Sequence, residues 1–339
     1  MTSTLLSATD LRNRIQQHLA ADLLTVNQIL QRQLSSSSVF VSDVVQHVSR
    51  YRGKQIRPVL LLLMSRLESG QSSERAQMLA AAVEAIHLAT LVHDDVIDES
   101  ETRRHVATVH RRWNTETSVL LGDFLFSRAF HLSAATGDAA ACALIGRATD
   151  RTCEGELHQI AARLEQSTSE RDYFRIIRGK TGHLFALSCQ LGMRSSGASA
   201  QNVRAAARFG MRLGLAFQIA DDVLDVTQSA TSTGKDEGND LQNGRRTLPV
   251  LRALTSAAVS ATASAQDDLR LLNEWLRGER TMSQAEFRSL PSVQTGIQSS
   301  LNTADLLIER AVRDLQTFPE TPDRRLLEAI AGFAIQRDQ

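Results

Sequence analysis

The chain has 339 residues, of which 42% are hydrophobic, and equal numbers of basic and acidic residues give a formal net charge of zero. This length allows one large domain or two smaller ones with a sizeable core. Zero net charge provides no overall field that would attract nucleic acid or an anionic membrane. Three scattered cysteines without CxxC spacing favour a reducing cytoplasm over a disulfide framework or a zinc site.

The predicted elements are helices along the whole chain. In the N-terminal region (1–34), apolar residues recur at helical spacing at Leu11, Ile15, Leu19 and Leu23. The longest aliphatic run, 59–64, is too short to span a bilayer, so no stable membrane insertion is expected. No proline falls between Pro58 and Pro249, and this tract permits long helices because a proline inside a helix costs about 3 kcal/mol.

Small polar stretches separate these helices and mark the predicted loops. They lie at 35–38, 69–73, 195–202, 227–234 and 255–266. No internal repeat and no long linker divides the chain. The prediction is an all-α fold, a single large helical bundle formed by residues 1–339, whose interior can hold a ligand site.

Two acidic clusters of the pattern DDxxD interrupt apolar helical stretches. They consist of Asp94, Asp95 and Asp98, and of Asp221, Asp222 and Asp225. Positions i and i+4 share a helix face, where like charges are mutually destabilising. One such cluster could be a solvated helix face, but two copies in similar apolar settings indicate a shared partner. Carboxylate oxygens suit Mg²⁺, which bridges carboxylates to substrate phosphates.

Basic residues accompany both clusters. They are Lys54 and Arg57 beside Gly53, Arg103 and Arg104 after the first cluster, Lys180 beside Thr181, and Lys235 and Arg245 after the second cluster. Each alone has an ordinary explanation as a polar helix start or a surface pair. Together they suit a diphosphate, because arginine can bind phosphate oxygens in a bidentate way. Binding to nucleic acid through the basic run 103–112 is not expected, since no aromatic residues are interleaved.

These motifs resemble those of the trans-isoprenyl diphosphate synthase (polyprenyl synthetase) family, especially its medium- and long-chain members. The resemblance covers a core from 53 to 249, with the segments in family order. They are GKQIRP at 53–58, HLATLVHDDVID at 87–98, RR at 103–104, GDFLFSRAF at 122–130, GKTGHLF at 179–185, FQIADDVLD at 217–225 and GKDEGNDLQNGRRTLP at 234–249. The resemblance implies the type I isoprenoid synthase fold with a central active-site cavity, a homodimer, and roughly three Mg²⁺ ions per site.

The resemblance also implies a role for each matching residue. The diphosphate of isopentenyl diphosphate would be bound by Lys54, Arg57, His87 and Arg104. The six aspartates would hold the magnesium ions that bridge the allylic diphosphate. That diphosphate would also contact Arg103, Lys180, Thr181, Gln218 and Lys235. Two positions depart from the family pattern: His105 replaces the usual glycine, which puts the local loop geometry in doubt, and Arg245 replaces the usual lysine.

The implied reaction is a head-to-tail (1'-4) prenyl transfer. Magnesium stabilises the departing diphosphate, the allylic C–O bond ionises, and the double bond of isopentenyl diphosphate attacks the allylic cation. A proton is then lost, and the resemblance assigns the base role to the departing diphosphate. Water must be excluded, because it would quench the cation.

Product length is predicted from the residues one helical turn before Asp94. Ala89 and Thr90 are small, whereas an aromatic residue there would close the tunnel for the growing chain. One turn is about 5.4 Å, comparable to one isoprene unit. The open turn therefore predicts a medium- or long-chain all-trans product of about six to ten units. Phe126 or Phe130 would form the floor of the tunnel, unless they are ordinary core residues.

Three alternative functions have different sequence requirements. A short-chain synthase that makes farnesyl or geranylgeranyl diphosphate would need another side chain to close the tunnel. A terpene cyclase is disfavoured by the intact second DDxxD and by the few tryptophans and tyrosines. A non-catalytic regulatory subunit is disfavoured because such subunits lose motif residues, whereas all six aspartates are present here.

Overall fold

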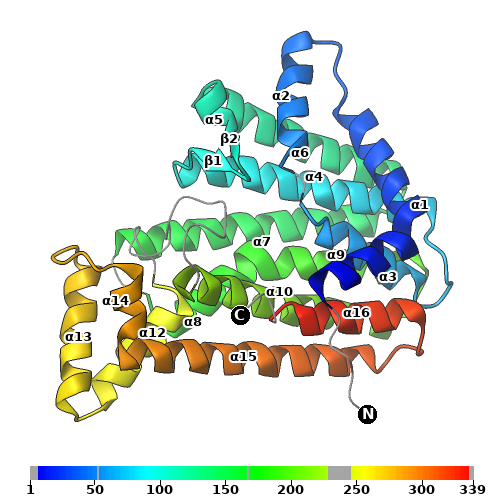
Figure 1. Cartoon of the computed structure of the whole chain (residues 1–339). Coiled ribbons are helices and arrows are strands. Elements are labelled where there is room, and N and C mark those ends of the chain that lie inside the picture. The colour runs from blue at the N-terminus through cyan, green and yellow to red at the C-terminus, as the bar shows by residue number, and fades with distance from the viewer. Residues whose placement is uncertain (1–6, 52, 166–167, 228–245, 336–339) are drawn as a thin grey trace.

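The computed structural model describes residues 7–51, 53–165, 168–227 and 246–335. Within these ranges, regular structure is helical except for one short hairpin (Figure 1). The elements in chain order are α1 (Ala8–Leu34), α2 (Val39–Ser49), α3 (Ile56–Arg66), α4 (Glu74–Ile97), β1 (Thr102–Arg103), β2 (Val106–Ala107), α5 (Val109–Arg112), α6 (Thr115–Ala135), α7 (Ala139–Leu164), α8 (Glu170–Ile177), the π-helix η1 (Arg178–Gly182), α9 (His183–Ser195), α10 (Ala200–Thr227), α12 (Leu248–Val259), α13 (Ala263–Leu276), α14 (Gln284–Ser289), α15 (Pro291–Leu315) and α16 (Pro322–Phe333). The predicted all-α class is confirmed.

The long helices lie stacked and roughly side by side. Figure 1 shows α4 and α6 above α7, with α10 below and α15 along the base. The most extensive helix–helix packing joins α4 to α6 and α10 to both α9 and α15. The shorter helices α12, α13 and α14 close one end of the bundle, and α1, α3 and α16 lie near the other end (Figure 1). This arrangement directs the C-terminal ends of α4 and α10 toward the same region.

Helix α3 is buried because it is apolar on nearly every side. Its residues from Pro58 to Ser65 are all buried, as expected for a helix without a polar face. Helix α4 is also mostly buried, with alanines packed against its neighbours. By length and composition alone α4 could cross a membrane, but 67% of its apolar window is buried inside the bundle. A core helix of a globular protein has the same properties.

The helix boundaries correct two predicted loops. The helix at 248–259 continues through Thr255, and α13 begins at Ala263, so the connection there is shorter than the predicted 255–266. Likewise α10 begins at Ala200, inside the predicted loop 195–202. Small polar residues favour loops, but the alanines between them favour helix, and both helices extend into the predicted loops. The predicted loops at 35–38 and 69–73 are confirmed.

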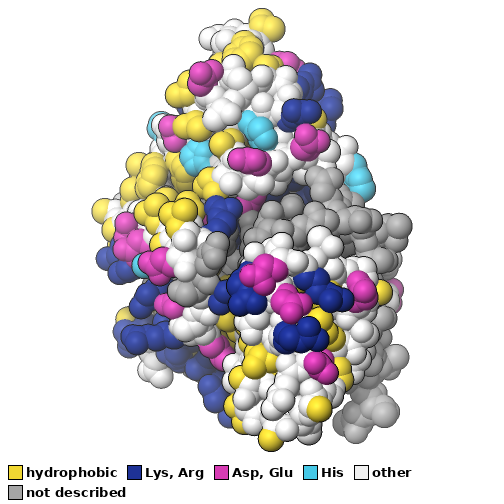
Figure 2. Space-filling view, turned by 90° about the vertical axis from the view of Figure 1, so that its left-hand side faces the viewer, with side chains coloured by type: hydrophobic (Ala, Val, Ile, Leu, Met, Phe, Trp, Pro, Cys, Tyr) yellow, Lys and Arg dark blue, Asp and Glu magenta, His cyan; other side chains and the backbone are white. Residues whose placement is uncertain are grey.

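Charges of both signs are interspersed on the face shown in Figure 2, most clearly over its lower half. Acidic and basic side chains are neighbours at the lower right, whereas basic side chains gather along the lower left edge of this face.

Candidate active site

The two acidic clusters lie on the last turns of α4 and α10, and each has one buried aspartate. Asp95 and Asp222 are 1% and 4% exposed, respectively, while the other aspartates of both clusters are partly exposed. The cause is helical geometry, because i and i+4 share a face and i+1 is turned away from it. The first and last aspartates of each cluster therefore face the site, and the middle one points into the protein.

Each buried aspartate is held by hydrogen bonds. The Nε of Arg103 donates to Asp95 Oδ1 at 2.6 Å. Asp222 accepts from the Tyr173 hydroxyl at 2.6 Å and from Gln218 Nε2 at 3.0 Å. Tyr173 was not predicted as a site residue, since a lone tyrosine carries no pattern in the sequence. These bonds fix the orientation of both clusters.

The π-helix η1 connects the two clusters. The Lys180 Nζ lies 3.7 Å from Asp94 Oδ2 of the first cluster. The next residue, Thr181, donates its hydroxyl to Gln218 Oε1 at 2.7 Å, and Gln218 in turn donates to Asp222 of the second cluster. Single π-turns inside helices are frequent at functional sites. Two adjacent residues of η1 thus reach both acidic clusters.

Glu156 of α7 is a site residue that sequence reasoning missed. Its Oε1 lies 2.9 Å from Lys180 Nζ. Burial raises the pKa of Glu156, and the nearby charge of Asp94 raises it further. For Lys180, burial by itself would lower the pKa, but Asp94 and Glu156 outweigh it and the pKa is raised. Lys180 is therefore a cation held between two carboxylates.

Close backbone packing brings α7 and η1 together. A Cβ added at Gly155 would lie 2.7 Å from the Lys180 backbone nitrogen and 2.8 Å from Gly179 Cα. A Cβ added at Gly179 would lie 2.6 Å from Gly155 Cα. Because only glycine fits on either side of this contact, the two backbones approach closely, and Glu156 lies beside Lys180. In the sequence, the adjacent Gly155 and Glu156 are the pattern that could have indicated this contact.

A second group of cations lies beside the first cluster. The pKa of Arg57 is lowered to about 10, chiefly by burial, while the charges of Glu84 and Asp221 oppose that shift. The Arg57 guanidinium lies 4.9 Å from the centroid of the Phe185 ring. Burial, and then the charges of Arg57 and Arg104, hold the pKa of His87 well below its usual value. His87 is therefore neutral at physiological pH, and the predicted cation site is an arginine–imidazole site.

Glu84 and Lys54 complete the description of this second group. Glu84 is buried in α4 and interacts electrostatically with Arg57 and Arg104, although it was not predicted. A glutamate at this depth offsets part of the mutual repulsion of the two arginines. Lys54 is exposed in the segment that precedes α3.

The hairpin β1–β2 presents Arg103 and Arg104. Its strands pair Thr102 with Ala107 and Arg103 with Val106, which leaves Arg104 and His105 as a two-residue turn. Both turn residues are left-handed, with φ of 52° and 63°. This is the turn geometry that favours glycine. His105 therefore preserves the loop geometry expected with glycine, at a conformational cost of about 1–2 kcal/mol.

The structure supports magnesium binding by the acidic clusters. Both clusters lie at helix C-termini, where the macrodipole disfavours negative charge by about 0.3–1 kcal/mol per group. Neither α4 nor α10 has a basic residue in its last turn. Asp95 Oδ2 is buried without a hydrogen-bond partner, and burial raises the pKa of Asp95 to about 6. A cation bound by the partly exposed aspartates would relieve the cost at the helix termini, and its charge would also favour the ionised form of Asp95.

Among the described residues, the carboxylates do not by themselves form a complete metal site. Over the described ranges, no group of three or more His, Cys, Asp or Glu side chains is close enough to hold a metal alone. Mg²⁺ characteristically uses one or two protein carboxylates together with waters and substrate phosphates. The separated clusters therefore fit magnesium that binds together with a diphosphate.

The family assignment rests on sequence and structural similarity. A sequence model of the polyprenyl synthetase family matches residues 39–292. The chain belongs to the polyprenyl synthetase family. It is 35% identical over 324 residues to heptaprenyl diphosphate synthase component 2 of Geobacillus stearothermophilus, covering 94% of this chain and 97% of that protein. It is 34% identical over 338 residues to the geranyl-diphosphate-specific all-trans-nonaprenyl-diphosphate synthase of Rhodobacter capsulatus, covering 98% and 100%.

Structural similarity extends over the same length. The polyprenyl synthase of Caulobacter crescentus, solved as a complex with calcium and isoprenyl diphosphate, superposes with a TM-score of 0.87. It is 33% identical and the superposition covers 99% of both chains. The predicted type I isoprenoid synthase fold of this polyprenyl synthetase is thereby confirmed.

The predicted chain-length residues of this polyprenyl synthetase lie on α4 and α6, which pack along their lengths. Ala89 is fully buried, and Thr90 donates its hydroxyl to the His87 carbonyl at 2.8 Å. Phe126 and Phe130 are one turn apart on α6 and pack against the main core. The Phe126 ring lies 5.8 Å from the ring of His93, the residue before the first cluster.

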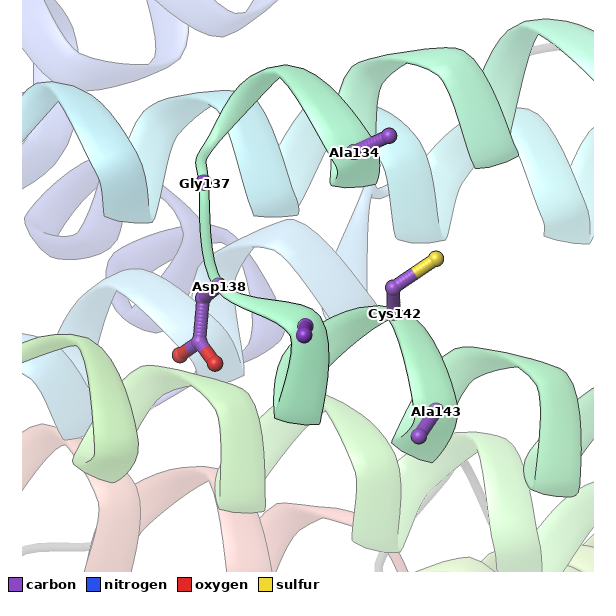
Figure 3. A pocket seen from close by; sticks show the side chains of 6 residues that line it. Ala134, Gly137, Asp138, Cys142 and Ala143 are labelled. Atoms are coloured by element: carbon purple, nitrogen blue, oxygen red, sulfur yellow. The ribbon is translucent and has the colours of Figure 1, made fainter.

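Two surface hollows of this polyprenyl synthetase lie away from the aspartates. One, of about 480 Å³, lies at the α6–α7 turn beside Asp138 and Cys142 (Figure 3). The other, of about 680 Å³, lies between α1 and α2. Neither is lined by a predicted site residue. Lys235 and Arg245 were also predicted to bind diphosphate and lie outside the described residues.

Proposed function

We propose that the protein is a magnesium-dependent prenyltransferase that adds isopentenyl units head-to-tail to an allylic diphosphate. The product proposed is an all-trans polyprenyl diphosphate of medium or long chain. The observation that carries the proposal is the presence of two adjacent anion sites of different chemistry. One contains two acidic clusters joined by Lys180 and Thr181, and the other contains Arg57, His87 and Arg104.

The two sites match the two substrates. An allylic diphosphate that must lose its diphosphate needs strong charge stabilisation on the leaving group. Magnesium held by the aspartates of both clusters would supply it. Isopentenyl diphosphate keeps its diphosphate during the reaction and needs only to be bound and oriented. A cation site without metal suffices for that purpose.

Different side chains bind the two substrates during the reaction. Lys180 and Thr181 bind the departing diphosphate as the allylic C–O bond breaks. Arg57 and Arg104 hold isopentenyl diphosphate so that its double bond faces the allylic cation, and neutral His87 donates a hydrogen bond without adding charge. The new C–C bond forms, and the proton lost from the isopentenyl unit passes to the departing diphosphate.

A medium- or long-chain product is supported by the small residue at Ala89 and by the relatives. Named relatives at 30% identity or more include heptaprenyl, octaprenyl and nonaprenyl diphosphate synthases. We infer that the growing chain passes Ala89 and extends toward Phe126 and Phe130. In this proposal Phe126 and Phe130 form the closed end of the tunnel.

The test is incorporation of radiolabelled isopentenyl diphosphate with magnesium and farnesyl or geranylgeranyl diphosphate, followed by sizing of the dephosphorylated products. The chain is assayed alone, because one relative is named as a component. Products beyond twenty carbons are expected. A limit of fifteen or twenty carbons would instead support the short-chain function, and no incorporation by folded protein would support a regulatory subunit.

The variant Ala89→Phe tests the tunnel directly. A phenyl ring at this fully buried position should shorten the products by several isoprene units, since one turn corresponds to about one unit. Thr90→Ser, which keeps a small hydroxyl side chain one residue later, is the matched control and should retain the product length. An unchanged product ladder in Ala89→Phe would place the tunnel elsewhere.

We also propose that the protein is a homodimer in the cytoplasm. Large apolar side chains are exposed on α6 and α7, at Leu120, Leu157 and Leu164, and burial against a second chain would remove this apolar area from water. Figure 2 shows hydrophobic side chains gathered at the left of the face that it presents. Sedimentation equilibrium should give twice the chain mass of 37.3 kDa, and a single-chain mass would contradict the proposal.

A further inference from the structure

We propose that His47 is a positioning residue for isopentenyl diphosphate, because as a neutral imidazole it anchors the hairpin that carries Arg104. This inference rests on the proposed function. His47 belongs to α2 and lies outside every motif that the sequence analysis singled out. Among the described residues, its side chain forms hydrogen bonds with Ala107 and Arg112 and not with an aspartate of either cluster.

Two hydrogen bonds determine the protonation state of His47. Its Nε2 lies 2.7 Å from the Ala107 carbonyl oxygen, which can only accept. Its Nδ1 lies 3.0 Å from Nη1 of Arg112, which can only donate. The imidazole must therefore carry its hydrogen on Nε2 and accept at Nδ1. Both partners independently require the same neutral tautomer.

Packing holds the ring in this orientation. His47 is 3% exposed, and the Trp113 ring meets it edge-on at 5.1 Å. The Arg112 guanidinium lies over the same tryptophan, 4.6 Å from its centroid. The Tyr51 hydroxyl also donates to the Ala107 carbonyl, at 3.2 Å. The carbonyl of Ala107, the last residue of β2, thus accepts two side-chain hydrogen bonds.

The hairpin requires such anchors. It has only two residue pairs, and isolated two-stranded hairpins are marginal in water. Its turn residues Arg104 and His105 are both left-handed without being glycine. On the β1 side, Arg103 is bonded to Asp95 at 2.6 Å. On the β2 side, His47 provides the shortest bond to Ala107, Tyr51 adds a longer one, and the next residue, Thr108, donates its hydroxyl to the Ser100 carbonyl at 2.8 Å.

The position of Arg104 depends on this anchoring. Its guanidinium lies against the backbone of Gly53, where an added Cβ would overlap it. It also lowers the pKa of His87, which places it within electrostatic reach of the isopentenyl diphosphate site. If the hydrogen bond between His47 and Ala107 is lost, the strained turn can relax and Arg104 can move away from that site. The allylic site is affected less, because Arg103 keeps its bond to Asp95.

Protonation of His47 should weaken the anchor. The charged groups around it are Arg112 of α5, Asp43 of α2 and Arg50 at the C-cap of α2, with the neutral Tyr51 beside them. Burial lowers the pKa of His47 and the two arginines lower it further; together they outweigh the Ala107 hydrogen bond and the charge of Asp43, which raise it. A second proton would leave Nδ1 unable to accept from Arg112 and would place two cations in contact. The anchor is therefore intact at neutral pH.

The test compares His47→Leu with His47→Gln. Leucine has similar size but no polar atom, whereas glutamine retains one donor for Ala107 and one acceptor for Arg112. His47→Leu should raise KM for isopentenyl diphosphate at least tenfold, while kcat and KM for the allylic diphosphate change less than threefold. His47→Gln should restore KM to within threefold of wild type. Tyr51→Phe, which removes the longer bond to the same carbonyl, should raise it about two- to threefold.

Two controls separate positioning from general destabilisation. Asp138→Ala removes the N-cap of α7 at the distant α6–α7 turn, so it should lower Tm without raising KM for isopentenyl diphosphate. Calorimetric titration of isopentenyl diphosphate alone should show the same tenfold loss for His47→Leu. This binding measurement still tests the inference if wild-type protein binds the diphosphate but fails to incorporate it.

Several results would overturn the inference. They are an unchanged KM and affinity in His47→Leu, a glutamine variant no better than the leucine variant at equal Tm, a parallel rise in KM for Asp138→Ala, and no binding of isopentenyl diphosphate by the wild type.

Discussion

Replacing Gly155 by alanine should impair the site through a single methyl group. The added Cβ would lie 2.7 Å from the Lys180 backbone nitrogen and 2.9 Å from the Gly179 carbonyl carbon. Both are backbone atoms, so no side chain can rotate away to accept it. Helix α7 and η1 must therefore separate, and η1 carries the Lys180 and Thr181 contacts to both acidic clusters.

The magnitude follows from the geometry. Ordinary contact begins at 3.4 Å, so the two backbones must move apart by about 0.7 Å in a close-packed interior. Overpacking of this kind costs about 1–3 kcal/mol, offset by about 1 kcal/mol from the better helix propensity of alanine. Displacement of catalytic groups by about 1 Å can reduce turnover as much as 100-fold. We expect a loss of about 10- to 100-fold in kcat with a fall in Tm of no more than a few degrees.

Gly146→Ala on the same helix is the matched control. Its added Cβ would meet only Phe130, at an ordinary 4.0 Å, so stability should rise by up to about 1 kcal/mol with kcat unchanged. The assay measures incorporation of isopentenyl diphosphate at saturating substrates, with thermal unfolding followed by circular dichroism. If Gly155→Ala retains kcat within twofold, the close approach of α7 to η1 does not position Lys180, and the reasoning fails.

Three further predictions concern stability and pH. His105→Gly should raise the free energy of unfolding by about 1 kcal/mol in chemical denaturation, because glycine relieves the left-handed turn; no gain would mean that the turn is unstrained. Arg66→Met should lower it by about 3–5 kcal/mol, since Arg66 bonds two largely buried aspartates of α1 and α16; a loss below 1 kcal/mol would contradict this. The Arg194 hydrogen bonds hold the pKa of Asp138 below 3.8, so this pair stabilises the protein above that pH and the effect is lost as pH falls through the lowered value. Asp138→Asn should therefore flatten the fall of Tm below about pH 4, and an unchanged slope would exclude the pair as its source.

The secondary-structure elements and the chemistry they carry could be predicted from local sequence patterns. Apolar residues at helical spacing and the proline-free tract predicted the all-α class, which the structure confirms. The i, i+4 spacing of Asp94 and Asp98 predicted a shared face, and both are partly exposed on the last turn and C-cap of α4. Such inferences succeed because helix period and local charge are properties of neighbouring residues.

The tertiary structure decided which residues act together. The contact between Glu156 and Lys180 joins residues 24 positions apart, and the hydrogen bond between His47 and Ala107 joins residues 60 positions apart. No periodicity encodes these pairings, since each depends on how closely elements far apart in the sequence pack. The glycines at 155 and 179 permit one such approach, but their partner is defined only when α7 and η1 meet. Spacing along the chain sets which groups share a helix face, whereas long-range packing sets the hydrogen bonds that orient them.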